Sequence, residues 1–220
     1  MNPSRTTCKR TAGRRPKSGG TGPGTRAEIL AAARRVFARH GLDGTSVREV
    51  AEVAGVNNAM IYYHFRDKVD LYRAVLADSF TAFDRIWEHT IFKTPAPARV
   101  KIQRYVEELI RFQHANEELR RILSMEFATC GKNIKWLAEN VFNHSYKKLA
   151  KILKEGVKNG DLKKVNPSIA ITTLVGMVIH SFIMRPLAEC VTGKNLNLSV
   201  RYFGDFVTDL FFDGLGAKSR

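Results

Sequence analysis

One stretch, residues 45–68, constrains the fold most, because it has the pattern of two short helices joined by a tight turn and followed by a third. Ser46 has a glutamate three residues later, which is the spacing of a capping box at a helix start. Gly55 ends the first short helix, because the residue after a helix C-terminus often needs a positive φ. Asn57 can cap the second, which runs to about Phe65. The pattern predicts a helix-turn-helix.

The second short helix has an apolar face, with Ile61 and Phe65, and a face that suits the major groove of DNA. Asparagine can pair with adenine, alanine can meet a thymine methyl group, and tyrosine or histidine can reach phosphate. A lysine in the first turn of the next helix opposes the helix dipole, so we expect it to contact phosphate. The predicted DNA-binding residues are Thr45, Ser46, Arg48, Asn57, Asn58, Ala59, Met60, Tyr62, Tyr63, His64 and Lys68.

The segment from Thr25 to about Leu76 resembles the DNA-binding domain of TetR-type transcriptional regulators. The resemblance is carried by a first helix ending in His40-Gly41, by GTSVREVA at 44–51, by AGV at 54–56 and by IYYHFRDK at 61–68. Residues 57–60 depart from the family's usual residues, which bears on the DNA sequence that is read. The resemblance implies a dimer on operator DNA, usually a repressor, in which a bound ligand moves the two reading heads out of register.

The formal charge of +15 favours a polyanionic partner. Residues 1–24 contain six basic residues and no acidic residue, whereas residues 25–72 contain seven basic and six acidic residues. Affinity of the reading domain must therefore come from placed contacts. The composition of residues 1–24 predicts a disordered basic tail. The tail could be a solubilising leader or an arm that contacts phosphate or the minor groove.

The sequence holds no motif typical of an enzyme or a metal site, such as a phosphate-binding glycine loop or a nucleophile elbow. Cys8, Cys130 and Cys190 are far apart and odd in number, which fits reduced thiols in a cytoplasm. The histidines lack zinc-site spacing, and His180 on an apolar helix is better interpreted as a core residue than as a catalytic base. No secretory signal is predicted. We expect a cytoplasmic protein without catalytic residues, metal, cofactor or membrane partner.

The rest of the chain predicts helices and no strand, with a boundary at Lys93–Pro97, which contains two prolines. Helices are expected at about residues 25–40, 67–89, 98–115, 117–128, 133–158, 167–184 and 198–212, besides the two in the motif. The expected fold is all-α with about nine helices. It comprises a tail at 1–24, a three-helix helix-turn-helix DNA-binding domain at 25–72, and a larger ligand-binding and dimerisation domain at 73–220.

The last two helices have apolar faces that are too wide for one small domain to cover. Residues 169–184 are nearly all apolar, yet too few and too polar for a membrane span, so a buried helix is expected. Such faces, unless buried internally, mark an oligomer interface, and we expect a homodimer through a four-helix bundle. The predicted interface residues are Ile169, Met177, His180, Met184, Phe203, Val207 and Phe211.

A ligand pocket is expected in the C-terminal domain, because aromatic and methionine side chains make adaptable walls. Any one of these residues could instead be ordinary core. The lack of an acid cluster favours a small hydrophobic organic effector, and the basic surplus favours an anionic one. The candidate wall residues are Phe83, Trp87, Tyr105, Leu109, Met125, Trp136, Phe142, Tyr146 and Met177.

Three functions fit the sequence. The first is a dimeric DNA-binding regulator with a small-molecule effector. The second is a constitutive DNA-binding protein without an effector, which the basic tail would suit. The third is a helical ligand-binding protein or enzyme in which residues 45–68 only brace the fold, and this leaves the exposed Tyr62, Tyr63 and His64 unexplained. An internal cavity lined by several helices would favour the first over the second.

Overall fold

The computed structural model describes residues 23–92, 95–197 and 199–215, and these residues form helices and no strand. Counting η1 with α4, and η2 with α7 and α8, gives nine helices in these ranges, so the all-α prediction is confirmed. The elements are α1 (Pro23–Gly44), α2 (Val47–Ala54), α3 (Asn58–His64), α4 (Lys68–Trp87), η1 (Glu88–Phe92), α5 (Ala98–Ala115), α6 (Glu117–Ala128), α7 (Ile134–Leu137), η2 (Ala138–Phe142), α8 (Asn143–Lys158), α9 (Pro167–Thr192) and α10 (Val200–Leu215).

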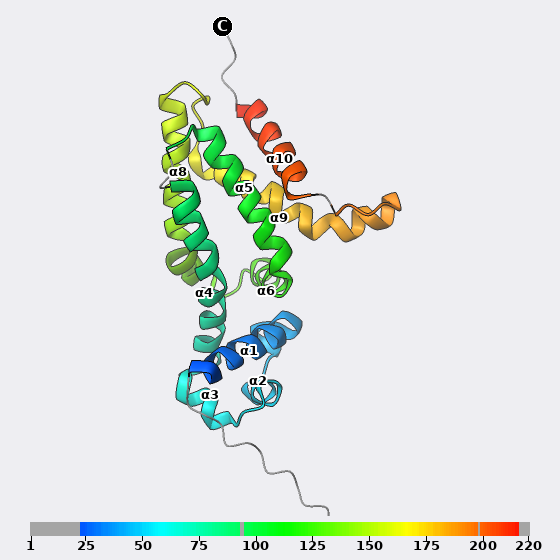
Figure 1. Ribbon diagram of the computed structural model, residues 1–220. Helices are drawn as coiled ribbons and strands as arrows, with labels where there is room; N and C mark the ends of the chain where they lie inside the picture. The colour runs from blue at the N-terminus through cyan, green and yellow to red at the C-terminus, as the bar shows by residue number, and fades with distance from the viewer. Residues whose placement is uncertain (1–22, 93–94, 198, 216–220) are drawn as a thin grey trace, which may run out of the picture.

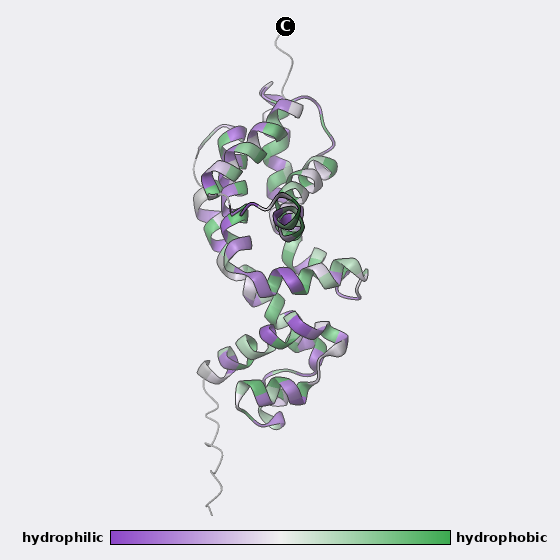
Figure 2. Ribbon diagram, turned by 90° about the vertical axis from the view of Figure 1, so that its right-hand side faces the viewer, coloured by the Kyte–Doolittle hydropathy of each residue, from purple (hydrophilic) through white to green (hydrophobic). Residues whose placement is uncertain are grey.

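Helices α1–α3 form a group at one end of the molecule, and α4 runs from this group into the larger body of α5–α10 (Figure 1). Apolar and polar residues alternate along most helices (Figure 2), as expected of amphipathic helices that each bury one face. The buried residues form one cluster that extends from Ile29 in α1 to Phe212 in α10. Residues 1–22 of the predicted basic tail and residues 93–94 of the proline boundary lie outside the described ranges.

Side-chain caps fix the starts of the helices around the turn, as predicted. The Ser46 Oγ accepts a hydrogen bond from the amide of Glu49 at 3.1 Å, and the Asn57 Oδ1 accepts one from the amide of Met60 at 2.8 Å. The Asp67 Oδ1 caps α4 at 2.8 Å. In a complete capping box the Glu49 carboxylate would accept a hydrogen bond from the backbone amide of Ser46. Here the Glu49 carboxylate lies 3.3 Å from the His40 Nε2 instead.

Two glycines shape the end of the molecule formed by α1–α3. Gly55 has φ 70° and ends α2, and Gly41 has φ 65° and interrupts α1 before its last residues. Both are backbone conformations that glycine adopts at little cost. The first helix was predicted at about residues 25–40, whereas α1 begins at Pro23, and proline suits a first helical turn.

A buried carboxylate joins α4 to α6 and the segment after it. Glu126 is 6% exposed, and its two oxygens accept hydrogen bonds from the Tyr72 hydroxyl at 2.9 Å and from the Asn133 amide at 2.8 Å. The Tyr72 ring meets the edge of the Phe37 ring of α1 at 5.0 Å between centroids. Burial, together with Glu126, raises the pKa of the Tyr72 hydroxyl, which therefore stays a donor. The junction thus links all three helices.

The predicted helix at 167–184 differs from α9, which continues through Pro186 to Thr192. Proline lacks the amide that would donate to the carbonyl one turn earlier, yet the helix continues through Pro186, which is exposed. The C-terminal part of α9 projects from the body (Figure 1). The expectation that residues 169–184 are buried was wrong, since the outer face of α9 is exposed along this range, for example at Ile169 and Met184.

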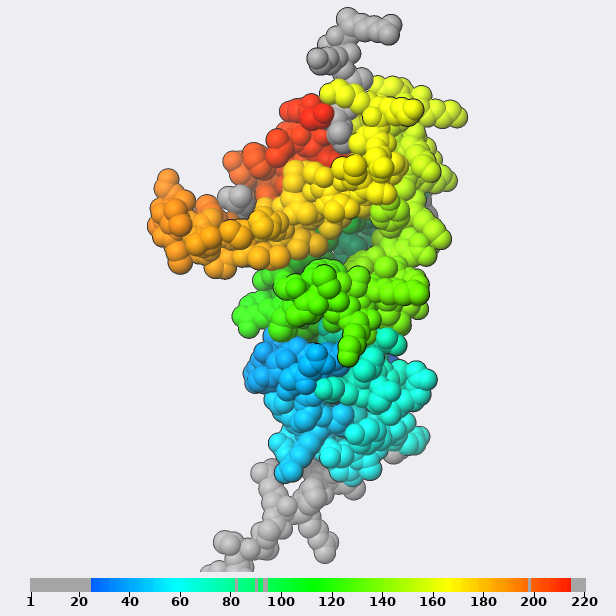
Figure 3. Space-filling view, turned by 180° about the vertical axis from the view of Figure 1, so that it is seen from behind, coloured from blue at the N-terminus to red at the C-terminus, as the bar shows by residue number. Residues whose placement is uncertain are grey.

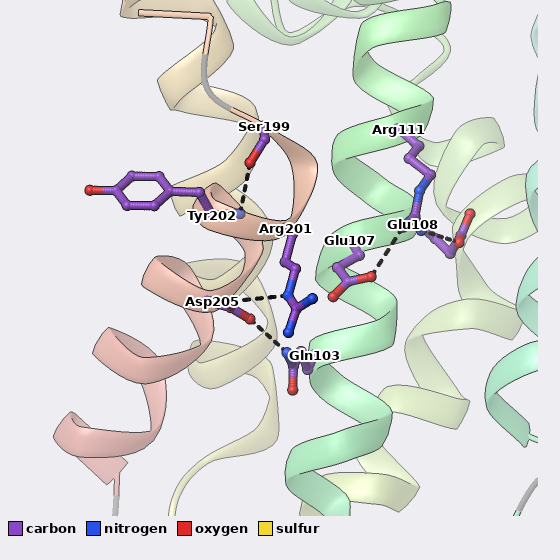
Figure 4. A network of polar contacts seen from close by, with 8 residues as sticks. All are labelled: Gln103, Glu107, Glu108, Arg111, Ser199, Arg201, Tyr202 and Asp205. Carbon is purple, nitrogen blue, oxygen red and sulfur yellow. Dashed lines mark hydrogen bonds and ion pairs between the residues drawn. The ribbon is translucent and has the colours of Figure 1, made fainter.

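Helix α10 lies along α5 and is held there by polar contacts (Figure 4). The Gln103 Nε2 donates to the Asp205 Oδ1 at 2.7 Å. Val207 and Phe211 are 2% and 4% exposed, so their side chains belong to the core of one subunit. Both were predicted at a dimer interface, and that prediction was wrong because this apolar stripe of α10 faces inward. Figure 4 shows Tyr202 pointing away from α5.

Replacing Gly131 by alanine tests the buried junction. A Cβ at this position would lie 2.2 Å from the Glu126 Oε1, which is closer than van der Waals contact allows. We expect Gly131→Ala to lower the free energy of unfolding by about 1–3 kcal/mol in urea denaturation, because the carboxylate loses its geometry. Gly214→Ala, where a Cβ would meet nothing within 4 Å, is the control and should not destabilise. Equal stability of both variants and the parent would contradict this account of the junction.

Candidate nucleic-acid interface and ligand cavity

Helix α3 presents an exposed polar and aromatic face at the end of the molecule. Ile61 and Phe65 are buried, whereas Tyr62 and Tyr63 are 56% and 70% exposed. Asn58 and Ala59 are exposed in the first turn of the same helix. Large aromatic side chains left in solvent on so short a helix are available to a groove or a phosphate backbone.

Three further predicted DNA-binding residues are exposed but already have a partner. Ser46 and Asn57 use side-chain oxygens as helix caps. The Arg48 Nε lies 3.0 Å from the Glu52 Oε1, and because both side chains are well exposed this ion pair is weak and can be exchanged for phosphate.

Three other predicted DNA-binding residues are less exposed to solvent than expected. Thr45 is 3% exposed and its hydroxyl donates to the Gly41 carbonyl at 2.7 Å, so its prediction as a DNA contact was wrong. The Thr45 hydroxyl instead holds the kink at Gly41, within α1. Met60 is half-buried and packs on the core, which leaves only part of its side chain to DNA. His64 is half-buried, and its buried Nε2 has no hydrogen-bond partner within the described structure.

Lys68 has an internal role that the sequence did not indicate. Its Nζ donates to the Thr45 carbonyl at 2.8 Å and to the Asp43 carbonyl at 3.3 Å. These bonds explain a cation in the first turn of α4 without phosphate. Lys68 therefore ties the start of α4 to the α1–α2 connection, and its replacement would disturb the fold of the head as well as any phosphate contact.

A cavity of about 490 Å³ lies inside the body, between α4, α5, α6, α8 and α9. The hollow is visible between α9 and α6 in Figure 3, with α4 at its back. Five of the nine predicted wall residues line it, namely Phe83, Tyr105, Leu109, Phe142 and Tyr146. The cavity is large enough for a drug-sized molecule, whose sites usually measure a few hundred cubic ångströms.

Four predicted wall residues do not line the cavity. Trp87 is 1% exposed and packs behind Tyr105, with ring centroids 4.3 Å apart. Trp136 lies under the Arg73 guanidinium, at 5.4 Å from it. Met125 faces Gly41 of α1, and Met177 lies on another side of α9 from Val175, which does face the cavity.

Further lining residues were missed by sequence reasoning. Phe80 is one turn before Phe83 on α4, so helical spacing could have found it. Phe112 contacts the rings of both, at 5.3 Å and 4.8 Å. His180, which was predicted at a dimer interface, lines the cavity instead.

Few polar groups reach the cavity, and Asp84 is the one with a formal charge among its described lining residues. The Ser145 hydroxyl donates to the Asp84 carboxylate at 3.4 Å. Burial raises the pKa of Asp84, against the lowering effects of that hydrogen bond and of His144 and Lys148. In the described ranges no group of three or more histidine, cysteine or acidic side chains could hold a metal ion.

An apolar surface covers the outer faces of α9 and α10. Of the predicted interface residues, Ile169 and Met184 are exposed, and Met177 and Phe203 are half-buried. By length and composition alone α9 could also cross a membrane. The exposed apolar residues that sequence reasoning missed here are Leu187, Val191, Tyr202, Phe206 and Leu210.

Comparison with known proteins places the motif in a family. Residues 29–75 match the model for bacterial regulatory proteins of the tetR family. The matched segment is therefore a TetR-type DNA-binding domain, and the chain resembles TetR-type transcriptional regulators. It is 24% identical to the transcriptional regulator AcrR of Shigella flexneri over 164 residues, which cover 72% of this chain and 74% of AcrR. It is 31% identical to the repressor BepR of Brucella suis over 100 residues, or 45% of this chain and 47% of BepR, so the alignment spans less than half of that relative.

The fold of the whole chain is shared with solved TetR-type structures. The transcriptional regulator FadR from Bacillus subtilis, in complex with stearoyl-CoA, has a TM-score of 0.72 at 20% identity, covering 86% of this chain and 98% of FadR. At this identity the likeness shows the fold alone. The TetR-type segment is a DNA-binding domain, and the two relatives named above are transcriptional regulators.

The exposed amide of Asn58 gives a direct test of the reading face. We expect Asn58→Ala to weaken operator binding by about 1–3 kcal/mol and to relax discrimination at one base pair, because a bidentate contact to a base edge is lost. Asn143→Ala, an exposed asparagine on α8, is the control. Fluorescence anisotropy with the operator and its single-base variants measures both effects. Unchanged affinity and unchanged discrimination would contradict a base contact by Asn58.

Proposed function

We propose that this TetR-type regulator is a cytoplasmic homodimer that represses transcription and leaves its operator when a small hydrophobic ligand occupies the cavity. The observation that carries the proposal is the position of the cavity. Helices α4 and α6 form part of its wall, and the same two helices hold the reading helices through α1. A ligand between them can therefore favour a different spacing of the two heads.

We assign the DNA-binding unit to residues 25–72 and the ligand-binding and dimerisation unit to residues 73–220. The DNA-facing side chains are those on the exposed side of α2 and α3, with Asn58, Ala59, Tyr62 and Tyr63 at the centre. Ser46, Arg48, Asn57 and His64 lie at the edges. Residues 1–24 fall almost wholly outside the described ranges, and we assign them no contact.

The path from cavity to head runs through α6. Leu123 and Phe127 line the cavity, while Met125 lies between them in sequence and faces Gly41 of α1. Glu126, the next residue, holds Tyr72 of α4. A shift of α6 that accommodates a ligand must therefore alter contacts to both helices that support α2 and α3.

The alternative is a constitutive DNA-binding protein without an effector. A protein of that kind has no need of an aromatic cavity inside its body, since cavities cost stability. Selection of operator DNA from a random pool, followed by a screen of hydrophobic compounds, decides between the two. We expect a near-palindromic site, and a compound that both quenches the fluorescence of Trp87, which packs against the cavity wall, and releases DNA. A broad screen that leaves DNA binding untouched would support the alternative.

We propose that the dimer forms through the exposed faces of α9 and α10. Soluble monomers rarely leave so continuous an apolar surface in water. Two such faces meeting across a two-fold axis would form a four-helix bundle, and the heads would then match successive major grooves about 34–36 Å apart, or a multiple of that spacing.

A paired substitution tests this interface. Phe206 and Leu210 are 57% and 55% exposed on α10, so Phe206→Glu with Leu210→Glu should leave the subunit folded but give monomers with weak operator affinity. Lys151→Glu on α8 changes the net charge by the same amount and should stay dimeric. Sedimentation velocity, with circular dichroism to check folding, measures the outcome. A folded double variant that remains a dimer would exclude this face.

The Tyr72 hydroxyl tests the path through α6. Removing it in Tyr72→Phe leaves Glu126 with one donor fewer, so we expect the coupling between ligand and DNA to change by about 0.5–2 kcal/mol while ligand affinity changes less. The coupling is the ratio of ligand affinities with and without operator DNA, measured by titration calorimetry. Tyr202→Phe, on the exposed face of α10, is the control. An unaltered ratio in Tyr72→Phe would exclude this path.

A further inference from the structure

The cavity contains a carboxylate, that of Asp84, with which no described cationic side chain makes a direct ion pair. Asp84 is half-buried on α4 among apolar side chains, and it forms no ion pair of 4.0 Å or less within the described part of the chain. The Ser145 hydroxyl, at 3.4 Å, is a long hydrogen bond and a weak compensation for desolvation.

The two basic groups whose charges act on Asp84 through space, Lys148 and His144, make their direct contacts with a different acid. The Lys148 Nζ bonds to the Glu88 carboxylate, one turn further along the chain, and the His144 Nε2 lies 3.7 Å from the same oxygen. Lys148 also lies over the Phe92 ring, with its Nζ 4.7 Å from the centroid. Glu88 is absent from the cavity wall, so the acid with direct cationic partners lies outside the cavity and the acid with only the long Ser145 hydrogen bond lines it.

The walls around Asp84 are aromatic. The centroid of the Phe112 ring lies 5.3 Å from that of Phe80 and 4.8 Å from that of Phe83. The centroids of the Phe80 and Phe142 rings are 5.2 Å apart. Aromatic faces attract cations as well as apolar groups, because the ring quadrupole is negative above and below its plane. A carboxylate within such walls favours a ligand that is both hydrophobic and positively charged.

We propose that the effector is a hydrophobic organic cation whose charge lies against Asp84 and whose apolar groups fill the aromatic part of the cavity. This inference rests on the proposed function of the cavity. The net charge of the chain led us to expect an anionic effector, and this proposal replaces that expectation. At physiological salt, ions screen charges that lie more than roughly 8 Å away. Asp84 lines the cavity itself, so its charge acts on a ligand more strongly than distant basic residues do.

Two ions of nearly the same size and shape but opposite charge test the proposal. Tetraphenylphosphonium is the cation and tetraphenylborate is the anion, and titration calorimetry with the full chain compares them, with stearoyl-CoA as a third ligand. We expect the phosphonium to bind more tightly than the borate. Asp84→Asn should lower its affinity roughly tenfold, because an ion pair is lost while shape is kept.

The matched control is Asp78→Asn, which removes the same charge from the same helix outside the cavity wall. It should leave phosphonium affinity within roughly twofold, because distant exposed charges are screened. Absence of phosphonium binding, tighter binding of the borate or of stearoyl-CoA, or equal effects of the two substitutions would overturn the proposal.

Release of operator DNA separates this inference from the proposed function. If stearoyl-CoA or the borate releases DNA and the phosphonium does not, the ligand-controlled regulator stands and the cationic effector fails. If the phosphonium binds in an Asp84-dependent way and no ligand in a broad screen releases DNA, the cationic site stands and ligand control fails.

Discussion

The two hydrogen bonds that hold the Glu126 carboxylate join the DNA-proximal end of the molecule to its body. A buried carboxylate is costly unless donors surround it, so the Tyr72 hydroxyl and the Asn133 amide must stay in place for the fold to remain stable. Breaking these hydrogen bonds costs more free energy than moving Glu126 together with its two donors. The junction is therefore expected to move as one unit, which the proposed transmission between the cavity and the reading head requires.

Helix α4 serves both ends of the molecule. Near its start Leu71 and Tyr72 are buried beside α1, and two turns later Phe80 and Phe83 face the cavity. Lys68 adds a bond from the first turn of α4 back to the α1–α2 connection. Because one continuous helix carries all of these contacts, a tilt of α4 in the body becomes a displacement of the head.

Local features were predictable from the sequence, and features that depend on packing were not. The caps by Ser46 and Asn57 and the positive φ of Gly55 follow from neighbouring residues alone, and they were predicted. Helix α10 has two apolar stripes, and only the packing on α5 decides that Val207 faces inward and Phe206 outward. Likewise no pattern along the chain distinguishes the wall of a cavity from the layer behind it, which is why Trp87 was predicted in place of Phe112.

Helix α9 connects the proposed interface with the cavity. Its inner face, with Ile171, Val175 and Ile179, lines the cavity, and its outer residues, including Ile169, remain exposed. In a dimer that buries the outer face, the same helix would contact the ligand on one side and the partner subunit on the other. Close packing makes such a helix respond by shifting rather than by deforming. A ligand that moves α9 would then alter the angle between the two subunits, and this adds to any movement of α4 in setting the distance between the reading heads.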